Sequence, residues 1–249
     1  MRTCLTDATD PGRLVTRRKA LARIGVSGAA LLTGLRPEPA CAQAPAGALP
    51  SCVARPEQTE GPFLVDEALN RSDIRSDPRT GEVKAGVPLR VVFNVSRLSG
   101  TNCLPLAGAQ VDLWHSDATG RYSDVPGFGS RPSTAGQQFL RGYQLTDSAG
   151  IAQFRTIFPG WYGGRAVHLH FKIRSVQGST PGHTFTSQLY FDDELTERVF
   201  AQEPYASRGR RWMRNDEDGI FRDSGKQLLL SAEPEGHGYA ASFAIGLLV

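Results

Sequence analysis

Two histidines that are one residue apart are the first candidates for chemistry in this sequence. His168 and His170 stand in the run VHLHFKI at 167–173. In a β-strand, residues i and i+2 point to the same face, so the two imidazoles project together and the intervening apolar residues face the other way. Two imidazoles side by side on a rigid strand form a bidentate platform for a metal. A pair of surface or half-buried histidines bridged to carboxylates is the alternative that this pattern leaves open.

Two tyrosines precede the histidines in positions where a loop can deliver them to the same place. Tyr162 follows a strand-like run and a Pro-Gly turn in TIFPGWY at 156–162, and Tyr122 follows VDLWHSDATGR at 111–121. Either tyrosine alone could be a packed aromatic whose hydroxyl is hydrogen-bonded. Two phenolates combined with two imidazoles, however, suit a +3 ion better than zinc, which prefers thiolate and imidazole.

The elements that must hold these side chains are mostly short strands. Runs rich in β-branched and aromatic residues alternate with Gly, Pro, Asn and Asp, which predicts an antiparallel sandwich or barrel rather than alternating strands and helices. Of the two, an all-β antiparallel β-sandwich is the fold that we expect. One short helix is expected over 193–202, begun by Asp193, and long loops connect the strands. The predicted strands cover residues 87–95, 109–114, 138–145, 152–157, 167–173 and 185–191, with two more in 227–249.

The motifs taken together resemble a known family. GRYS at 120–123, TD-x-x-G-x-x-x-FRTI-x-PG-x-Y at 146–162 and R-x-x-H-x-H-F at 165–171 follow the order and spacing of the intradiol ring-cleavage dioxygenases. That family includes catechol 1,2-dioxygenases and protocatechuate 3,4-dioxygenases, and the resemblance covers residues 60–221. It implies an Fe(3+) cofactor whose ligands are Tyr122, Tyr162, His168 and His170.

The same resemblance implies the reaction and three further roles. A catechol-type diol is opened by O₂ between its two hydroxyls, and both oxygen atoms enter a cis,cis-muconate-type product. Tyr162 is the ligand that the substrate displaces, and it takes a substrate proton. Arg165 stabilises charge that develops on the ring, and Gln188 helps to position the ring. A salt bridge that merely steadies the loop is the alternative role for Arg165.

Two other classes of function compete with this interpretation. A non-catalytic periplasmic module that binds aromatics or glycans could share the fold, because a fold does not fix a function. Such a module has no need for two tyrosines, two histidines and an arginine, so the complete set favours the enzyme. A copper or zinc hydrolase would need a carboxylate base, and the metal motifs contain none.

The chain departs from the better-known members of the family in ways that affect substrate choice and assembly. Only five residues separate Tyr162 from His168, and nothing corresponds to a helical dimerisation region. These departures resemble a smaller, secreted branch of the family and leave the oligomeric state open. They predict a wide, mostly apolar mouth, covered by Phe63 and Leu64. No extra Arg or Lys is evident beside the metal motifs to pair with a carboxylate on the ring.

The first part of the chain has the features of an export signal. Arg17-Arg18 precedes a short apolar stretch and Ala-Cys-Ala at 40–42, which resembles a twin-arginine signal over residues 1–42. A general secretory signal or a disordered arm would also fit. The stretch is too short and broken to span a bilayer permanently. The expected organisation is therefore a signal at 1–42, an N-terminal arm at 43–60, and a catalytic domain at 61–249 in the periplasm or outside the cell.

Charge and cysteine content fit this organisation. The formal net charge is +3, but residues 1–42 hold seven Lys/Arg and three Asp/Glu, which leaves 21 against 22 in the remainder. No basic stripe remains there for a nucleic acid. Of the four cysteines, Cys52 and Cys103 would survive removal of the signal. A disulfide between them is expected in an oxidising compartment, although two unpaired thiols remain an alternative.

Overall fold

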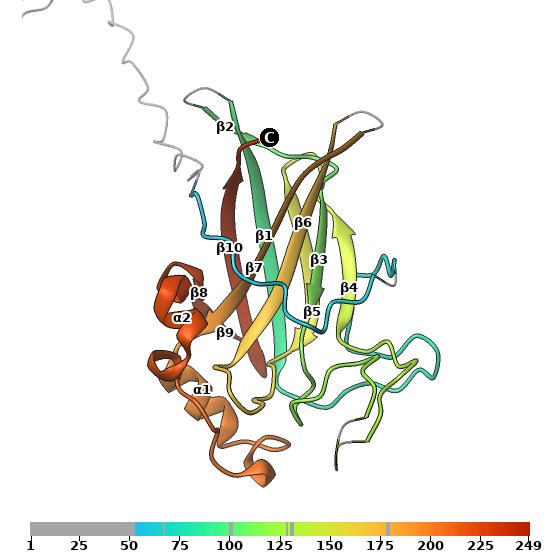
Figure 1. Cartoon of the computed structure of the whole chain (residues 1–249), viewed down its shortest axis with the longest axis vertical. Helices are drawn as coiled ribbons and strands as arrows, with labels where there is room; N and C mark the ends of the chain where they lie inside the picture. The colour runs from blue at the N-terminus through green and yellow to red at the C-terminus, as the bar shows by residue number, and fades with distance from the viewer. Residues whose placement is uncertain (1–52, 67, 100–101, 128, 130–131, 178–179) are drawn as a thin grey trace, which may run out of the picture. The chain divides into compact units, whose positions relative to one another are not determined.

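The computed structural model describes residues 53–249, apart from residues 67, 100–101, 128, 130–131 and 178–179. The expected signal and the first part of the arm lie outside the described residues. Two five-stranded sheets pack face to face, as Figure 1 shows, so the predicted all-β sandwich is confirmed. One sheet contains β1 (Pro88–Ser99), β2 (Asn102–Pro105), β5 (Ile151–Ile157), β9 (Ala232–Glu235) and β10 (Gly238–Leu247). The other contains β3 (Gln110–Trp114), β4 (Arg141–Leu145), β6 (His168–Gln177), β7 (Thr180–Phe191) and β8 (Leu229–Leu230).

The pairing of the strands is largely but not wholly antiparallel. The second sheet has the order β4-β3-β6-β7-β8, and in the first sheet β1 pairs with β2, β5 and β10. Two pairs, β1 with β10 and β7 with β8, are parallel. Both sheets are therefore mixed, because β10 runs beside β1 in the same direction and β8 runs beside β7 in the same direction.

The core lies between the two sheets, and β1 shows the alternation that builds it. On β1, Val91, Phe93 and Val95 are fully or almost fully buried, while the residues between them are less so. The Phe93 ring lies 5.3 Å from that of Phe171 on β6 and 6.1 Å from that of Phe243 on β10. Aromatic contacts of this kind join the two sheets and fix the frame on which the site is built.

The helices lie near the end of the sandwich where the long loops gather (Figure 1). Helix α1 (Asp193–Phe200) is the predicted helix, but its N-cap is Asp192, whose carboxylate accepts from Glu194 N and Leu195 N. A second helix, α2 (Gly219–Ser224), was not predicted. Short 3₁₀ turns are η1 (Ala206–Arg208), η2 (Asn215–Glu217) and η3 (Gly225–Leu228). None of the helices among the described residues is both long and apolar enough to cross a membrane.

Two features of the N-terminal half bear on the expectations above. The segment at 53–66 contains no helix or strand and crosses the outer face of the second sheet, where Gln58 N donates to Thr186 O at 3.0 Å (Figure 1). Cys103, on β2, is disulfide-bonded. The partner expected for it, Cys52, lies outside the described residues.

Candidate active site

Strand β6 delivers two buried histidines to the outer face of its sheet. Val167, Leu169 and Phe171 point into the core, so His168 and His170 point outward beneath the segment that covers this face. Their exposed fractions are only 2% and 1%. The predicted common face of the two histidines is therefore confirmed, whereas the alternative of surface histidines is wrong.

The two imidazoles converge on one point. His168 Nε2 lies 3.0 Å from His170 Nε2, and His168 Nδ1 lies 2.6 Å from Ala166 O. Because a carbonyl oxygen only accepts, His168 Nδ1 carries the proton and its Nε2 presents a lone pair. Burial lowers the pKa of His168 to about 3 and that of His170 well below its ordinary value. Both rings are accordingly neutral, which is the form that binds a metal.

The two tyrosines reach the same place from separate loops. Tyr162 Oη lies 3.1 Å from His168 Nε2, and the ring centroids of Tyr122 and Tyr162 are 5.7 Å apart. Tyr122 Oη is buried and has no hydrogen-bond partner among the described residues. Burial is the main cause that raises the pKa of both phenols in the absence of a cation. Four possible metal ligands thus lie close together: two imidazole nitrogens and two phenol oxygens. The lone pair of His168 Nε2 cannot accept hydrogen bonds from all of its neighbours at once.

A tight turn sets the position of Tyr122. Asp117 Oδ1 accepts hydrogen bonds from Thr119 N at 2.9 Å and from Arg121 N at 3.1 Å. Gly120 in this turn has φ +78°, and a Cβ there would lie 2.1 Å from Trp161 O. Only glycine fits this close approach, which brings the turn against the chain that carries Tyr162.

The segment that covers the sheet also approaches the histidines closely. Gly61 has φ +72°, and a Cβ there would lie 3.3 Å from His170 Cε1. On its other side His170 stacks on Trp114, with ring centroids 5.1 Å apart and an interplanar angle of 9°. Phe63 stacks on Tyr122 at 4.4 Å. These contacts restrict the access of water to the cluster, and Phe63 lies where the sequence predicted an apolar cover.

Arg165 lies beside the cluster and is anchored by an acid that the sequence did not reveal as part of the site. Its Nε donates to Asp218 Oδ2 at 2.9 Å, and Ala166 N donates to the same oxygen at 2.9 Å. Asp218 is 2% exposed, and its other oxygen caps α2 through Ile220 N at 2.8 Å. The one available signal was the acidic residue directly before Gly-Ile-Phe at 219–221, which is typical of a helix N-cap. Arg165 Nη1 lies 3.5 Å from His168 Nε2, so the guanidinium faces the cluster.

Gln188 belongs to the same polar network. It pairs with His170 across the β6–β7 ladder, and its Oε1 accepts from Arg165 Nη2 at 2.5 Å. Its Nε2 donates to Thr59 O at 2.9 Å, so all of the amide's contacts to the described residues hold it in one orientation. The resemblance implied that Gln188 helps to position the ring, and that role stays a prediction. In this structure its amide is bonded to Arg165, Tyr190 and Thr59.

Tyr190 completes the network and was also missed by the sequence interpretation. It pairs with His168 in the ladder, and its hydroxyl lies 2.9 Å from Gln58 Oε1 and 3.1 Å from Gln188 Oε1. One hydroxyl proton can serve only one of these two acceptors at a time. Arg165 Nη2 donates to the Tyr190 oxygen at 3.3 Å. The network therefore ties the covering segment, β7 and Arg165 together.

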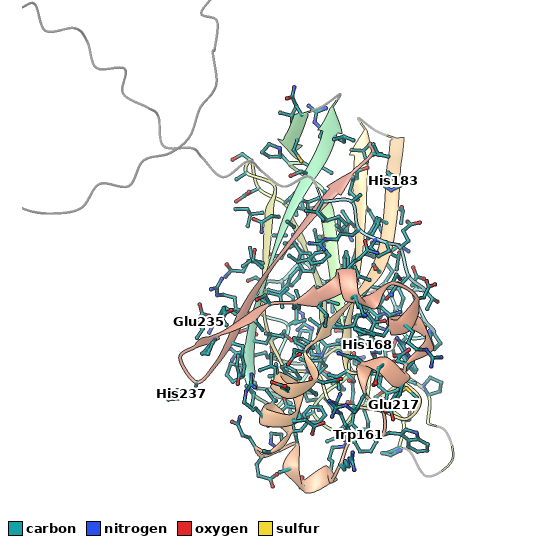
Figure 2. All side chains as sticks on the ribbon, turned by 90° about the vertical axis from the view of Figure 1, so that its left-hand side faces the viewer. Trp161, His168, His183, Glu217, Glu235 and His237 are labelled. Atoms are coloured by element: carbon teal, nitrogen blue, oxygen red, sulfur yellow. The ribbon has the colours of Figure 1, made fainter. Side chains whose placement is uncertain are left out.

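The other histidines lie elsewhere or are fully occupied. Figure 2 shows His183 and His237 at separate edges of the molecule, away from His168. His115 is buried, and its ring nitrogens contact Ser116 O at 2.7 Å and Thr156 Oγ1 at 2.6 Å. Among the described residues no group of three or more His, Cys, Asp and Glu side chains could hold a metal. Among these residues, a metal that takes more than two protein ligands at the cluster would therefore need a tyrosine as a donor.

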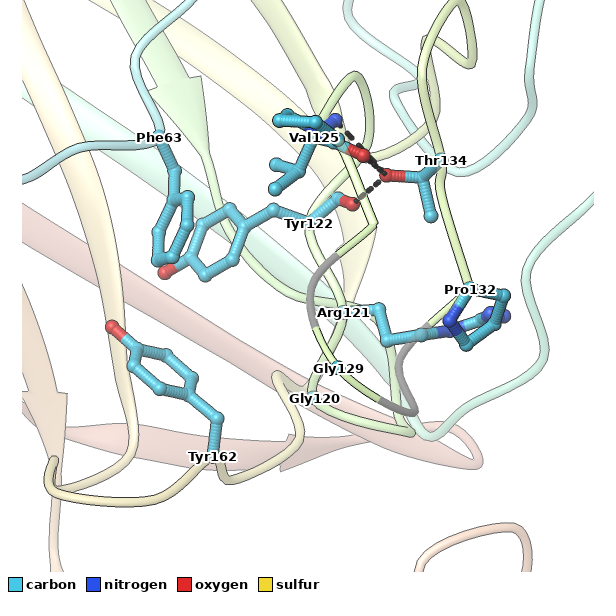
Figure 3. Close-up of a pocket in the computed structure, with 10 residues that line it drawn as sticks. Phe63, Gly120, Arg121, Tyr122, Val125, Gly129, Pro132, Thr134 and Tyr162 are labelled. Carbon is cyan, nitrogen blue, oxygen red and sulfur yellow. Dashed lines mark hydrogen bonds between the residues drawn. The ribbon is translucent and has the colours of Figure 1, made fainter.

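A cavity of about 610 Å³ opens on the two tyrosines (Figure 3). Its described wall is mostly apolar, and it also contains Arg121, which is adjacent to Tyr122 in the chain. The sequence interpretation did not single out Arg121 as a cation of this wall, and the expectation that no cation pairs with a carboxylate on the ring itself stays a prediction. The lining residues are Phe63, Gly120, Arg121, Tyr122, Val125, Pro126, Gly129, Pro132, Thr134 and Tyr162.

Fold and cluster define a β-sandwich protein with two histidines and two tyrosines gathered beside a cavity. Comparison with known proteins shows the family. The protein family described as Dioxygenase matches residues 59–210. An intradiol ring-cleavage dioxygenase from Tetranychus urticae superposes with a TM-score of 0.67 at 30% identity, covering 79% of this chain and 95% of that one. The chain belongs to the intradiol ring-cleavage dioxygenase family.

Two further relatives differ in how much of their length is matched. The dioxygenase domain of a dioxygenase–carbohydrate-binding protein fusion from Streptomyces sp. SirexAA-E has a TM-score of 0.56 at 27% identity, covering 79% of this chain and 99% of that one. A chlorocatechol 1,2-dioxygenase from Rhodococcus opacus is 29% identical over 157 residues, 54% of this chain and 55% of that enzyme. The match therefore spans about half of the latter enzyme.

Proposed function

We propose that this protein is an Fe(3+)-dependent enzyme that cleaves catechol-type diols between their hydroxyls with O₂. The observation that carries the proposal is the convergence of Tyr162 Oη and His170 Nε2 on His168 Nε2, at 3.1 Å and 3.0 Å. Tyr122 Oη, buried without a partner at the same cavity, supplies a fourth donor. Relatives named as catechol and chlorocatechol 1,2-dioxygenases support the choice of substrate class.

The donor set fits iron(III) in chemistry and charge. Two tyrosinates would offset two of its three charges, so that the ion could be enclosed at tolerable cost, and two neutral imidazoles add no charge. The proposed ligands are Tyr122, Tyr162, His168 and His170. When bound, the ion would supply Lewis acidity and draw electron density from the catecholate, which makes the ring reactive toward O₂.

In the proposed reaction Tyr162 would be the ligand that the substrate replaces. It is the tyrosine whose hydroxyl contacts His168, and it lies on the wall of the cavity through which a catechol would enter. Its phenolate oxygen would accept one of the two catechol protons, as a base located within the site. The carbon–carbon bond between the two hydroxyl-bearing carbons breaks and both atoms of O₂ enter the product. The reaction therefore needs no external reductant.

Arg165 acts on the charge that develops on the ring. Asp218 and Gln188 occupy its Nε and Nη2, which leaves Nη1 facing the histidine pair. A donor held in place before the reaction need not reorganise when charge develops, which is the main advantage of a preorganised site. Gln188 acts mainly through Arg165, because its own amide groups are engaged with protein atoms.

The proposed site of action is outside the cytoplasm, in the periplasm or beyond the cell. The twin-arginine-like sequence at 1–42 motivates this proposal, and the disulfide at Cys103 is compatible with an oxidising compartment. Folded export would allow iron to be loaded before transport.

The decisive experiment is to purify the protein and compare it with and without catechol. We expect about one iron per chain, a visible tyrosinate-to-iron(III) absorption band that shifts when catechol binds, and consumption of one O₂ for each cis,cis-muconate formed. Colourless protein that contains stoichiometric zinc would contradict the metal assignment. Coloured protein that binds catechol but consumes no O₂ would favour the non-catalytic binding module.

A further inference from the structure

The cavity beside the tyrosines is far larger than one aromatic ring requires. A cavity of about 150 Å³ suffices to hold benzene, whereas this one measures about 610 Å³. That volume falls in the range of pockets that enclose drug-sized ligands. A catechol whose oxygens lie at the tyrosine hydroxyls therefore leaves most of the space to whatever the ring carries.

The described wall of this space offers one cation and otherwise mainly apolar surface. Val125, Pro126 and Pro132 line it together with Arg121. The Arg121 side chain is 37% exposed, and its Nε lies 3.2 Å from Thr119 Oγ1 and 3.9 Å from Asp117 Oδ2. Its two terminal amino groups donate no hydrogen bond within the described part of the chain. Those groups form the planar fork that matches a carboxylate.

The position of Arg121 is set by the same turn that sets Tyr122. Asp117 accepts from Arg121 N at 3.1 Å, and Asp117 N donates to Arg121 O at 2.8 Å. In Figure 3 the hydroxyls of Tyr122 and Tyr162 lie on the side of Phe63, and the Arg121 side chain leads away from them. A carboxylate attached directly to the ring would reach less far from the tyrosine hydroxyls than one on a longer side chain, which would extend toward the guanidinium.

We propose that Arg121 binds a carboxylate at the end of a hydrocarbon side chain on the catechol, and so determines substrate preference. The apolar wall would contact the hydrocarbon part, and the free fork of Arg121 would pair with the acid. This inference rests on the proposed function for its ring site.

The test compares 3,4-dihydroxyphenylpropionate with its methyl ester in the holoenzyme. For Arg121→Gln we expect the acid-to-ester ratio of kcat/KM to fall about tenfold, the effect of losing a partly exposed charge-assisted pair. In Arg121→Lys this ratio should fall less, because lysine keeps a point charge but lacks the planar fork. Arg97→Gln, which removes an exposed arginine from β1, should keep the wild-type ratio.

The acid-to-ester ratio separates a loss of carboxylate binding from damage to the neighbouring Tyr122, because such damage would slow the turnover of both substrates alike. An unchanged ratio in Arg121→Gln, or an equal fall in Arg97→Gln, would overturn the proposal. If kcat/KM for protocatechuate, whose carboxylate is on the ring, fell as much in Arg121→Gln, that result would overturn the proposal too. Anaerobic binding of the acid and the ester gives a second readout. If no catechol is turned over, the proposed function fails. A roughly tenfold loss in the relative affinity of Arg121→Gln for the acid would still support the role of Arg121.

Discussion

Asp218 Oδ2 accepts a 2.9 Å hydrogen bond from Arg165 Nε, in an ion pair whose side chains are 2% and 17% exposed. The same carboxylate caps α2 and holds Ala166 N, two residues before His168. One acid thus fixes the direction of the guanidinium and the chain that enters the histidine strand. The Arg165–Asp218 ion pair is consequently compatible with both roles of Arg165, a structural salt bridge in the loop and the proposed catalytic donor. Mutations can distinguish the two roles.

Asp218→Asn should slow turnover without removing the metal. Asparagine is a good N-cap, so α2 should persist. When its oxygen caps the helix, its NH₂ group faces the donors Arg165 Nε and Ala166 N, and these two hydrogen bonds are lost. We expect kcat to fall about 10- to 10²-fold, as for a displaced reacting group, with little change in KM or iron content. Asp216→Asn, at an exposed position in η2, is the matched control. Parallel loss of iron and activity in Asp218→Asn would indicate a purely structural role.

Arg165→Ala should leave iron and colour nearly intact and lower turnover by about 10²-fold or more, because a preorganised donor is removed. Iron analysis, the visible spectrum and kcat are the measurements. Arg155→Ala, at an exposed position on β5, controls for the loss of an arginine. If iron is lost in proportion to activity, the salt-bridge role is the correct one.

His168→Ala or His170→Ala should lose most of the iron, because each removes one of two converging Nε2 atoms. His183→Ala, at an exposed position, should retain it. The ratio of iron to protein after purification decides the matter, and full iron in either strand variant would contradict the ligand assignment.

Tyr162→Phe should retain part of the iron but bind catechol more slowly, since the phenolate that takes a proton is absent. Stopped-flow mixing with catechol under anaerobic conditions measures this step. Tyr143→Phe on β4 is a control outside the cluster. Binding at the wild-type rate in Tyr162→Phe would show that another group accepts the proton.

Local periodicity sufficed to predict the part of the site that lies on one strand. Alternation along β6 places His168 and His170 on one face, whatever the partner strands are. Tyr122 and Tyr162 came from family motifs, because nothing local distinguishes them from packed tyrosines. The helix start was wrong by one residue because Asp192 and Asp193 are both suitable caps, and only the backbone geometry selects Asp192.

Contacts between distant segments could not be predicted in the same way. Asp218 is 53 residues from Arg165 and follows two other acids, so only packing singles it out. Arg121 was overlooked because the turn that aims it into the cavity depends on the contact of Gly120 with Trp161. Likewise, alternation predicts that β1 and β10 are strands but cannot show that they pair in parallel.

Replacement of Arg17 and Arg18 by lysine should retain the precursor in the cytoplasm if export follows the twin-arginine route. A general secretory signal tolerates this change because it requires only positive charge before the apolar stretch. Fractionation followed by immunoblotting of precursor and mature forms measures the outcome. Unchanged export of the double variant would reject the twin-arginine route, and cytoplasmic wild-type protein would reject export itself.

The disulfide at Cys103 should form only in the exported protein and should stabilise it. Cys103 lies on β2, opposite Leu98 of β1. Its disulfide therefore links the edge of the first sheet covalently to the partner cysteine. Loss of a native disulfide costs about 2–4 kcal/mol, so Cys103→Ser should lower the free energy of unfolding by that amount. Peptide mapping without reduction should identify Cys52 as the partner, and the oxidised protein should resist alkylation. Free Cys52 and Cys103 thiols in exported protein, or a variant as stable as the wild type, would contradict this prediction.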